Sequence, residues 1–263
     1  MTDTQTKKTG DFCWVELCTP DIQKAQTFYK KLFSWHLEDI PMPDGANYTM
    51  MKVGETPIAG GYQITPELEA QGAVPHWASY VLVDDADNTT KRAKTLGATI
   101  YKEPFDVSDM GRMAVLADPT GAVFYLWQPK QGPADALPKD EAGNLGWNEL
   151  VTPDTKTAAK FYTDLFGWKA ETQEMPSGKV YTSFFNGEKT VGGMLELTED
   201  WNGAPPHWGV YFSVADLDKT IASAKSLSGQ IVYEPISAPS VGRFTAIADP
   251  QGVHFSVIEF EKS

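Results

Sequence analysis

The chain is poor in the residues that build disulfides and metal clusters. It has two cysteines and four histidines among 263 residues. Cys13 and Cys18 have an odd spacing on one expected strand, so their side chains face opposite sides and cannot easily pair. Unpaired cysteines fit a reducing compartment, and we expect a cytoplasmic protein. Four histidines, of which we expect His36 to be exposed, exclude a metal cluster rich in this ligand.

Long apolar runs and basic patches are also lacking. No run approaches the roughly 20 apolar residues that a membrane span needs. Residues 1–10 are polar, so we expect a loose tail rather than a signal peptide or anchor. Acidic residues outnumber basic ones by 35 to 22, for a formal net charge of −13. Such a surface repels phosphate backbones and anionic lipids, which predicts no nucleic-acid and no membrane partner.

What the sequence does contain is an internal repeat. Residues 14–17 (WVEL) recur as residues 147–150 (WNEL). The other matched pairs, in chain order, are TPD at 19–21 and 152–154, FY at 28–29 and 161–162, LF at 32–33 and 165–166, PHW at 75–77 and 206–208, GR at 111–112 and 242–243, and DPTG at 118–121 with DPQG at 249–252. This order predicts a duplication. We expect a tail at 1–10, domains at 11–128 and 146–261, and a Pro- and Gly-rich linker at 129–145.

Each copy reads twice as a strand, a helix and three further strands. Asp21 can cap a helix whose apolar residues share one face. These residues are Ala25, Phe28, Tyr29, Leu32 and Phe33. Extended runs follow near 35–40, 47–53 and 56–64, and the second half-copy repeats the plan with a helix at 85–96. Residues 118–121 suit a type I turn between the last two strands. The sequence therefore predicts an α+β fold of four βαβββ modules, forming two domains with curved sheets that enclose cavities.

These motifs resemble the vicinal oxygen chelate superfamily of glyoxalase I, extradiol dioxygenases and bleomycin-resistance proteins. The resemblance covers nearly the whole chain and rests on TPD, FY, LF and DPxG followed by an apolar strand. The WxEL, PHW and GR…DPxG motifs look most like the two-domain glyoxalase-related branch. The resemblance implies a small-molecule ligand in each cavity, but a fold names a reaction poorly.

Metal-using members of that family hold a divalent ion with His, Glu or Gln on the first and last strands. Carried across to this chain, those positions fall on residues that are poor ligands. They are Trp14, Trp147, Ala78, Gly209, Tyr125, Ser256 and the glycine pairs 60–61 and 192–193. Tryptophan, alanine and glycine offer no usable lone pair, whereas Zn²⁺, Fe²⁺ or Ni²⁺ needs several N, O or S ligands. We therefore predict no metal and no cofactor.

Other polar side chains share the strand faces of the replaced ligands. The candidate catalytic residues are Glu16, His76, Glu149 and His207. A buried Glu beside a His can act as acid and base. In an alternative interpretation, each glutamate caps backbone N–H groups or forms an ion pair with Arg112 or Arg243, and the histidines are structural. The candidate substrate-binding residues are Trp14, Tyr80, Tyr125, Trp147, Tyr211 and His254, since aromatic walls suit a flat or apolar ligand.

Three functions fit these residues. The first is a metal-independent binding protein, like the bleomycin-resistance members. The second is a lyase, isomerase or hydrolase that uses the Glu and His residues on a small carbonyl or polyol compound. The third is a metal-dependent lyase or dioxygenase with relocated ligands at Glu149, His207 and His254. We expect a monomer or homodimer with a small-molecule partner, and the sequence leaves open which modules pair.

Overall fold

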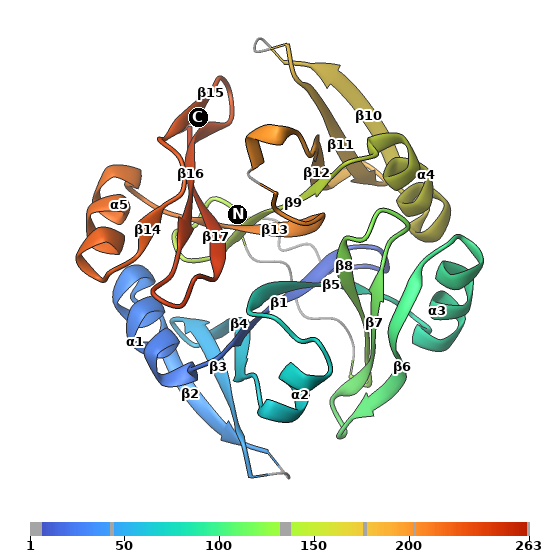
Figure 1. Ribbon diagram of the computed structural model, residues 1–263, viewed down its shortest axis with the longest axis horizontal. Helices are drawn as coiled ribbons and strands as arrows, with labels where there is room; N and C mark the ends of the chain where they lie inside the picture. Colours follow the sequence, from blue (N-terminus) through green and yellow to red (C-terminus); the bar gives the residue numbers. More distant parts are fainter. Residues whose placement is uncertain (1–6, 43–44, 132–137, 176–177, 202, 262–263) are drawn as a thin grey trace. The chain divides into compact units, whose positions relative to one another are not determined.

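The structure, a computed structural model, describes residues 7–42, 45–131, 138–175, 178–201 and 203–261. Within these ranges a strand, a helix and further strands follow one another four times (Figure 1). We call these four segments modules 1 to 4, in chain order. This repetition confirms the predicted βαβββ plan. No helix among the described residues is long and apolar enough to cross a membrane.

Modules 1 and 2 make up the first repeat. Module 1 consists of β1 (Phe12–Thr19), α1 (Ile22–Phe33), β2 (His36–Pro41), β3 (Asn47–Val53) and β4 (Thr56–Gln63). A short helix, α2 (Pro66–Ala70), follows it and has no counterpart among the expected elements. Module 2 consists of β5 (His76–Leu82), α3 (Ala86–Thr95), β6 (Thr99–Val107), β7 (Gly111–Ala117) and β8 (Val123–Pro129).

Modules 3 and 4 make up the second repeat. Module 3 consists of β9 (Leu145–Thr152), α4 (Thr155–Phe166), β10 (Lys169–Glu174), β11 (Val180–Asn186) and β12 (Lys189–Glu196), and the 3-10 turn η1 (Glu199–Trp201) follows it. Module 4 consists of β13 (His207–Ser213), α5 (Leu217–Ser226), β14 (Gln230–Ile231), β15 (Ile236–Ala238), β16 (Gly242–Ala248) and β17 (His254–Phe260). Its second strand is split between Ile231 and Ile236, whereas the matching strand β6 is continuous and shows only register shifts.

An aspartate begins each of the four long helices. Asp21, Asp85, Asp154 and Asp216 each accept a hydrogen bond from the backbone N–H three residues on. Such a cap satisfies one of the unpaired amides of the first turn and stabilises a helix by about 1 kcal/mol. The predicted cap at Asp21 is confirmed, and the helix that we expected over 85–96 forms between Asp85 and Leu96.

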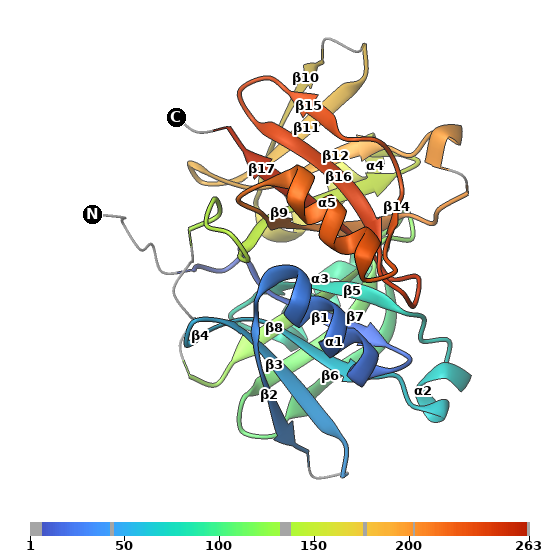
Figure 2. The ribbon, with the colours of Figure 1, turned by 90° about the vertical axis from the view of Figure 1, so that its left-hand side faces the viewer.

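The chain divides into two compact units, and each unit combines modules from both repeats. Unit 1 contains the described residues of Met1–Cys13, Ser79–Ala136 and Trp147–Gly209, which are mainly modules 2 and 3. Unit 2 contains those of Trp14–Ala78, Leu137–Gly146 and Val210–Ser263, which are mainly modules 1 and 4. Figures 1 and 2 show α1 beside α5 in unit 2, and Figure 1 shows α3 beside α4 in unit 1.

Within each unit, the first strand of a module runs parallel to its last strand. In unit 2, β1 pairs with β4, with Glu16 opposite Gly60. In unit 1, β9 pairs with β12 in the matching register, with Glu149 opposite Gly193. Strands β2, β3 and β4, and likewise β10, β11 and β12, continue as antiparallel ladders. Equal registers place equivalent side chains at equivalent points of the two units.

The repeated motifs build a buried hydrogen-bond chain in each core. In unit 2, Trp77 Nε1 donates to Tyr29 Oη at 3.1 Å, and Tyr29 Oη donates to Asp249 Oδ2 at 3.2 Å. In unit 1, Trp208, Tyr162 and Asp118 repeat this arrangement at 2.7 Å and 2.9 Å. We call these the core triads. They explain the PHW, FY and DPxG motifs, because each motif supplies one member.

Candidate functional site

A second pair of hydrogen-bond chains lies on the opposite face of the strands. On β1, Val15 and Leu17 point into the core of unit 2, so alternation directs Trp14 and Glu16 to the other face. Trp14 Nε1 donates to Tyr48 Oη at 3.0 Å, and Tyr48 is hydrogen-bonded to Glu16. Burial, followed by the charge of Glu16, raises the pKa of Tyr48. The phenol is therefore neutral and able to donate to the carboxylate.

Unit 1 carries the same arrangement on β9, β11 and β12. Trp147 Nε1 donates to Tyr181 Oη at 3.0 Å, and Tyr181 Oη donates to Glu149 Oε2 at 3.0 Å. Burial and the Glu149 charge raise the pKa of Tyr181. We call Trp14–Tyr48–Glu16 and Trp147–Tyr181–Glu149 the face triads. Their tryptophans and tyrosines are half-buried, whereas Glu16 and Glu149 are 9% and 7% exposed.

A glycine makes room for each face triad. A Cβ added at Gly60 would lie 1.7 Å from Tyr48 Oη, and one added at Gly193 would lie 1.9 Å from Tyr181 Oη. No real Cβ approaches an oxygen so closely, so any side chain at either glycine would have to displace the tyrosine. The phenol oxygens therefore occupy the space that a side chain from β4 or β12 would otherwise enter.

Tyr48 and Tyr181 were missed in the sequence, although a signal for them was present. Both stand in a tyrosine-threonine pair, at 48–49 and 181–182, and they have the same offset between copies as the WxEL motif. Strands β3 and β11 carry no other conspicuous motif, so this coincidence was easy to overlook. A tyrosine that recurs opposite a recurring glycine was the available clue.

The candidate histidines at the strand starts bind backbone. His76 Nδ1 lies 2.7 Å from the carbonyl oxygen of Val74, and His207 Nδ1 lies 2.8 Å from that of Pro205. Both rings are half-buried, and burial lowers the pKa of His76. These contacts agree with the alternative that the recurring histidines fix the start of β5 and β13. Their catalytic role stays a prediction.

The other candidate substrate-binding residues include three buried tyrosines, two of which pack against each other. Tyr80 and Tyr125 face each other across β5 and β8 of unit 1, with ring centroids 4.7 Å apart. Tyr211 of unit 2 is buried opposite Ser256 on β17. His254, by contrast, is exposed at the start of β17, so its ring is not part of a buried wall.

The arginines that might have held the glutamates have other partners. Arg112 binds both carboxylate oxygens of Asp87 on α3, at 2.6 Å and 3.1 Å. Arg243 binds Asp218 on α5 in the same way, at 2.9 Å and 3.0 Å. The repeated GR motif thus anchors the helices of modules 2 and 4. Glu149 accepts a hydrogen bond from Tyr181.

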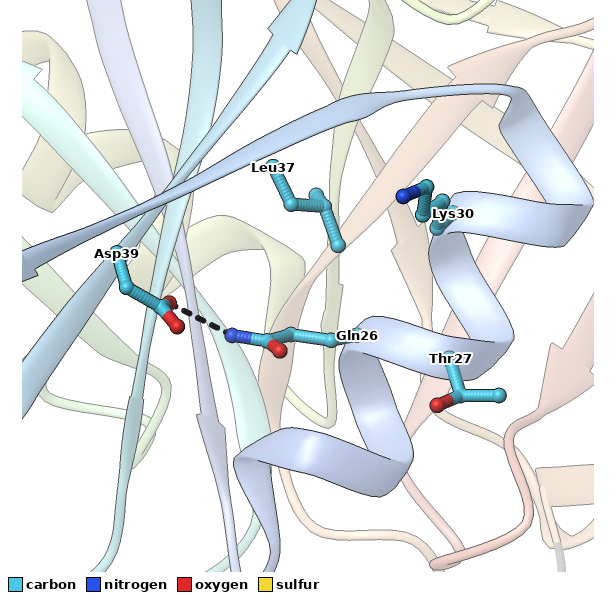
Figure 3. Close-up of a pocket in the computed structure, with 5 residues that line it drawn as sticks. All are labelled: Gln26, Thr27, Lys30, Leu37 and Asp39. Carbon is cyan, nitrogen blue, oxygen red and sulfur yellow. Dashed lines mark hydrogen bonds between the residues drawn. The ribbon is translucent and has the colours of Figure 1, made fainter.

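A separate surface hollow lies between α1 and β2 of unit 2 (Figure 3). Gln26 Nε2 donates to Asp39 Oδ1 at 2.7 Å and to Thr49 Oγ1 at 2.8 Å. These polar groups satisfy one another and hold α1 against the sheet. At the matching place in unit 1, Thr172 and Thr182 share a single hydrogen bond of 3.1 Å.

Comparison with known proteins agrees with this architecture. The family model of the Glyoxalase/Bleomycin resistance protein/Dioxygenase superfamily matches residues 12–126 and again residues 144–257. The chain belongs to this superfamily. The match confirms the resemblance that the TPD, FY and DPxG motifs indicated and finds one glyoxalase domain in each repeat.

Two relatives match along nearly their whole length. The "Putative glyoxylase CFP32" of Mycobacterium tuberculosis is 38% identical over 247 residues, which are 94% of this chain and 93% of the relative. The "Anthracycline biosynthesis protein DnrV" of Streptomyces peucetius is 34% identical over 263 residues, which are 96% of this chain and 94% of the relative.

Solved structures of a glyoxalase and of a dioxygenase share the fold. The Mn(II)-bound glyoxalase of Novosphingobium aromaticivorans has a TM-score of 0.62 at 17% identity and covers 97% of this chain and 83% of its own. Homoprotocatechuate 2,3-dioxygenase of Brevibacterium fuscum, in complex with 3,4-dihydroxyphenylacetate, has a TM-score of 0.64 at 17% identity and covers 97% and 82%. At this identity the likeness shows the fold alone.

The side chains of this superfamily member do not fit the divalent metal that the family implies. Ala78 and Gly209 offer no donor atom, and at Gly60 and Gly193 a tyrosine oxygen fills the space of a ligand side chain. The relocated set of Glu149, His207 and His254 gains no support either, because His254 is exposed at the start of β17. Over the described ranges, no group of three or more His, Cys, Asp and Glu could hold a metal ion.

Proposed function

We propose that this superfamily member binds a small planar aromatic or quinonoid molecule at its face triads, without the divalent metal of its metal-using relatives. The observation that carries the proposal is the position of the tyrosine hydroxyls over Gly60 and Gly193. Each hydroxyl bonds to both an indole N–H and a carboxylate, so the site presents organic hydrogen-bonding groups where a metal ligand would otherwise stand.

The chemistry of the triads supports a planar ligand. Trp14 and Trp147 are half-buried and so retain exposed indole surface on which a flat ring can stack. Glu16 and Glu149 add an acceptor for a hydroxyl or an acidic C–H. Two relatives are named for anthracycline biosynthesis, and the dioxygenase neighbour holds a catechol compound. We assign further ligand contacts to Tyr80, Tyr125, Tyr211 and, at its exposed strand end, His254.

Metal independence is tested by binding in chelator. We expect 1,4-naphthoquinone, a neutral planar probe, to bind with the same Kd in EDTA as in buffer, measured by titration calorimetry. Elemental analysis of the purified protein should find no stoichiometric transition metal. About one zinc, manganese, iron or nickel per repeat, together with loss of binding in EDTA, would overturn the proposal.

The face glutamates are tested by an isosteric change. Glu16→Gln and Glu149→Gln should each abolish binding of 1,4-naphthoquinone at one unit. Each change removes the negative charge of the carboxylate that orients the tyrosine hydroxyl and the ligand. The free energy of unfolding should change by less than about 1 kcal/mol, since the amide oxygen still accepts from the tyrosine. Glu103→Gln, at an exposed position on β6, is the control and should leave binding unchanged. Losses of about 2 kcal/mol or more in both face variants would make the glutamates structural.

A second candidate function is proton transfer, and the Tyr181–Glu149 contact of 3.0 Å favours it. A carboxylate held by a neutral phenol can take a proton from carbon next to a carbonyl group, as in an isomerase or lyase. Dihydroxyacetone in D₂O is a suitable probe, because enolisation replaces its C–H protons by deuterium in the NMR spectrum. The Glu16→Gln/Glu149→Gln double variant should abolish any exchange above the buffer rate. If the wild-type protein catalyses no exchange, the binding function alone stands.

A further inference from the structure

The two faces differ at the strand positions next to the triads. On β1 and β4 of unit 2, the residue pair beyond Glu16 and Gly60 is Cys18 opposite Tyr62. On β9 and β12 of unit 1, the matching pair is Val151 opposite Leu195. The strand registers are the same, so these four residues extend the triad faces by one step on the same side. A thiol and a phenol in one unit therefore replace two aliphatic side chains in the other.

In unit 2, Cys18 and Tyr62 form a hydrogen bond, and the Cys18 thiol is not a nucleophile. Cys18 Sγ donates to Tyr62 Oη at 3.0 Å. Burial, followed by the nearby charge of Glu16, raises the pKa of Cys18, so the thiol stays protonated. The cysteine is 1% exposed, whereas Tyr62 is half-buried and so is the more accessible member of the pair. Cys18 thus positions Tyr62, and Tyr62 is the member that a ligand can touch.

We propose that Tyr62 makes the two faces selective for different ligands. The unit 2 face takes a planar molecule that carries a hydroxyl or carbonyl group at its edge, which Tyr62 binds. The unit 1 face binds a planar molecule whose edge is apolar and packs against Val151 and Leu195. This inference rests on the proposed binding function and adds to it the polarity of each ligand.

The test uses two probes of nearly equal shape, 2-naphthol and 2-methylnaphthalene. Two-site titration of the wild-type protein should show that one site prefers 2-naphthol about fivefold more strongly than the other, the effect of one net hydrogen bond beyond the glutamate acceptor that both sites share. Tyr62→Phe removes only the hydroxyl and should abolish that extra preference. The reciprocal Val151→Cys/Leu195→Tyr variant should give the other site an extra preference of the same size.

The control is Tyr101→Phe, at a tyrosine that is 61% exposed on β6, and it should leave both sites unchanged. An extra preference that survives Tyr62→Phe overturns the inference and leaves the binding function intact. If the wild-type protein binds neither probe and also fails to bind 1,4-naphthoquinone, the proposed function fails with it. Circular dichroism melts of each variant confirm that a lost preference does not reflect an unfolded unit.

Discussion

The core triads and the face triads use the same three kinds of group in different surroundings. In both, an indole N–H donates to a phenol, and the phenol donates to a carboxylate. The tyrosines of the core triads are fully buried, whereas those of the face triads are half-buried. A core triad also joins three modules, as with Trp77 of module 2, Tyr29 of module 1 and Asp249 of module 4, whereas a face triad lies within one module. The same hydrogen-bond chain can therefore hold a fold together or remain available to a ligand.

The largest expected effect comes from removing a core hydroxyl. Tyr162→Phe leaves the Trp208 N–H without its acceptor and takes one donor from Asp118, both inside the core of unit 1. We expect the free energy of unfolding to fall by about 2 kcal/mol or more, measured in urea. Tyr181→Phe makes the same change on the face and should cost less than about 1 kcal/mol while weakening binding of 1,4-naphthoquinone. Equal losses in the two variants would end the distinction between the triads.

A smaller effect is expected from filling the space under a face triad. Gly193→Ala places a Cβ 1.9 Å from Tyr181 Oη, so the tyrosine must swing away and leave both Glu149 and Trp147. Overpacking of this kind costs about 1–3 kcal/mol, and the lower end applies because the end of a side chain can move. We expect binding at unit 1 to be lost. Tyr181→Leu/Gly193→Ala should recover most of the stability but none of the binding, and a double-mutant cycle measures this coupling.

Gly60→Ala is the equivalent variant in unit 2. It should displace Tyr48 in the same way and abolish binding at that unit alone. If either alanine variant binds 1,4-naphthoquinone as the wild-type protein does, the triad is not the binding site.

The smallest expected effect concerns pH and the core of unit 2. Burial raises the pKa of Asp249 above the ordinary value of 3.8, although backbone amides of Val253 and Gln251 and the Tyr29 hydroxyl oppose this. The folded state then holds this proton more tightly than the unfolded state. Asp249 therefore makes stability fall as the pH rises from about 3.8 through its raised pKa. Urea melts between pH 3.5 and 7 should show this decline in the wild-type protein and a flatter profile in Asp249→Asn. Identical profiles would contradict the assignment.

Local features of the fold were predictable because each rests on a few neighbouring residues. Asp21 and Asp85 marked helix starts through their side-chain oxygens, and residues 118–121 form the expected turn, with Gly121 N donating to Asp118 O at 3.0 Å. The split between β14 and β15 at Pro235 and the short helix α2 were not expected. The start of α2 is marked locally by the Thr65 cap and by Pro66 in the first turn, but five residues are too few to show helical periodicity. The split has no comparable marker, because β6 carries Pro104 at the position that matches Pro235 and is continuous.

The pairing of modules could not be predicted, and the tyrosine of each face triad was missed. Four similar modules offer equivalent partners, so no sequence pattern decides whether α1 packs against α3 or α5. At the site, strand alternation correctly placed Glu16 beside Trp14, and the PHW motif drew attention to His76. The residue of that motif that the core uses is instead its neighbour Trp77. Tyr48 and Tyr181 reach the glutamates from other strands, a contact that exists only after the sheet has formed.

Because unit 2 combines the first and the last module of the chain, the two units can fold only in a certain order during synthesis. Tyr29 and Asp249 of its core triad are 220 residues apart in the chain, whereas Tyr162 and Asp118 of unit 1 are separated by 44. At about 5–20 residues per second, a ribosome adds module 4 tens of seconds after module 1. Unit 1 can therefore close while translation continues, whereas the aromatic face of α1 must wait for the end of the chain. A nascent chain arrested before β17 would carry that face uncovered, as a surface for chaperones or for aggregation.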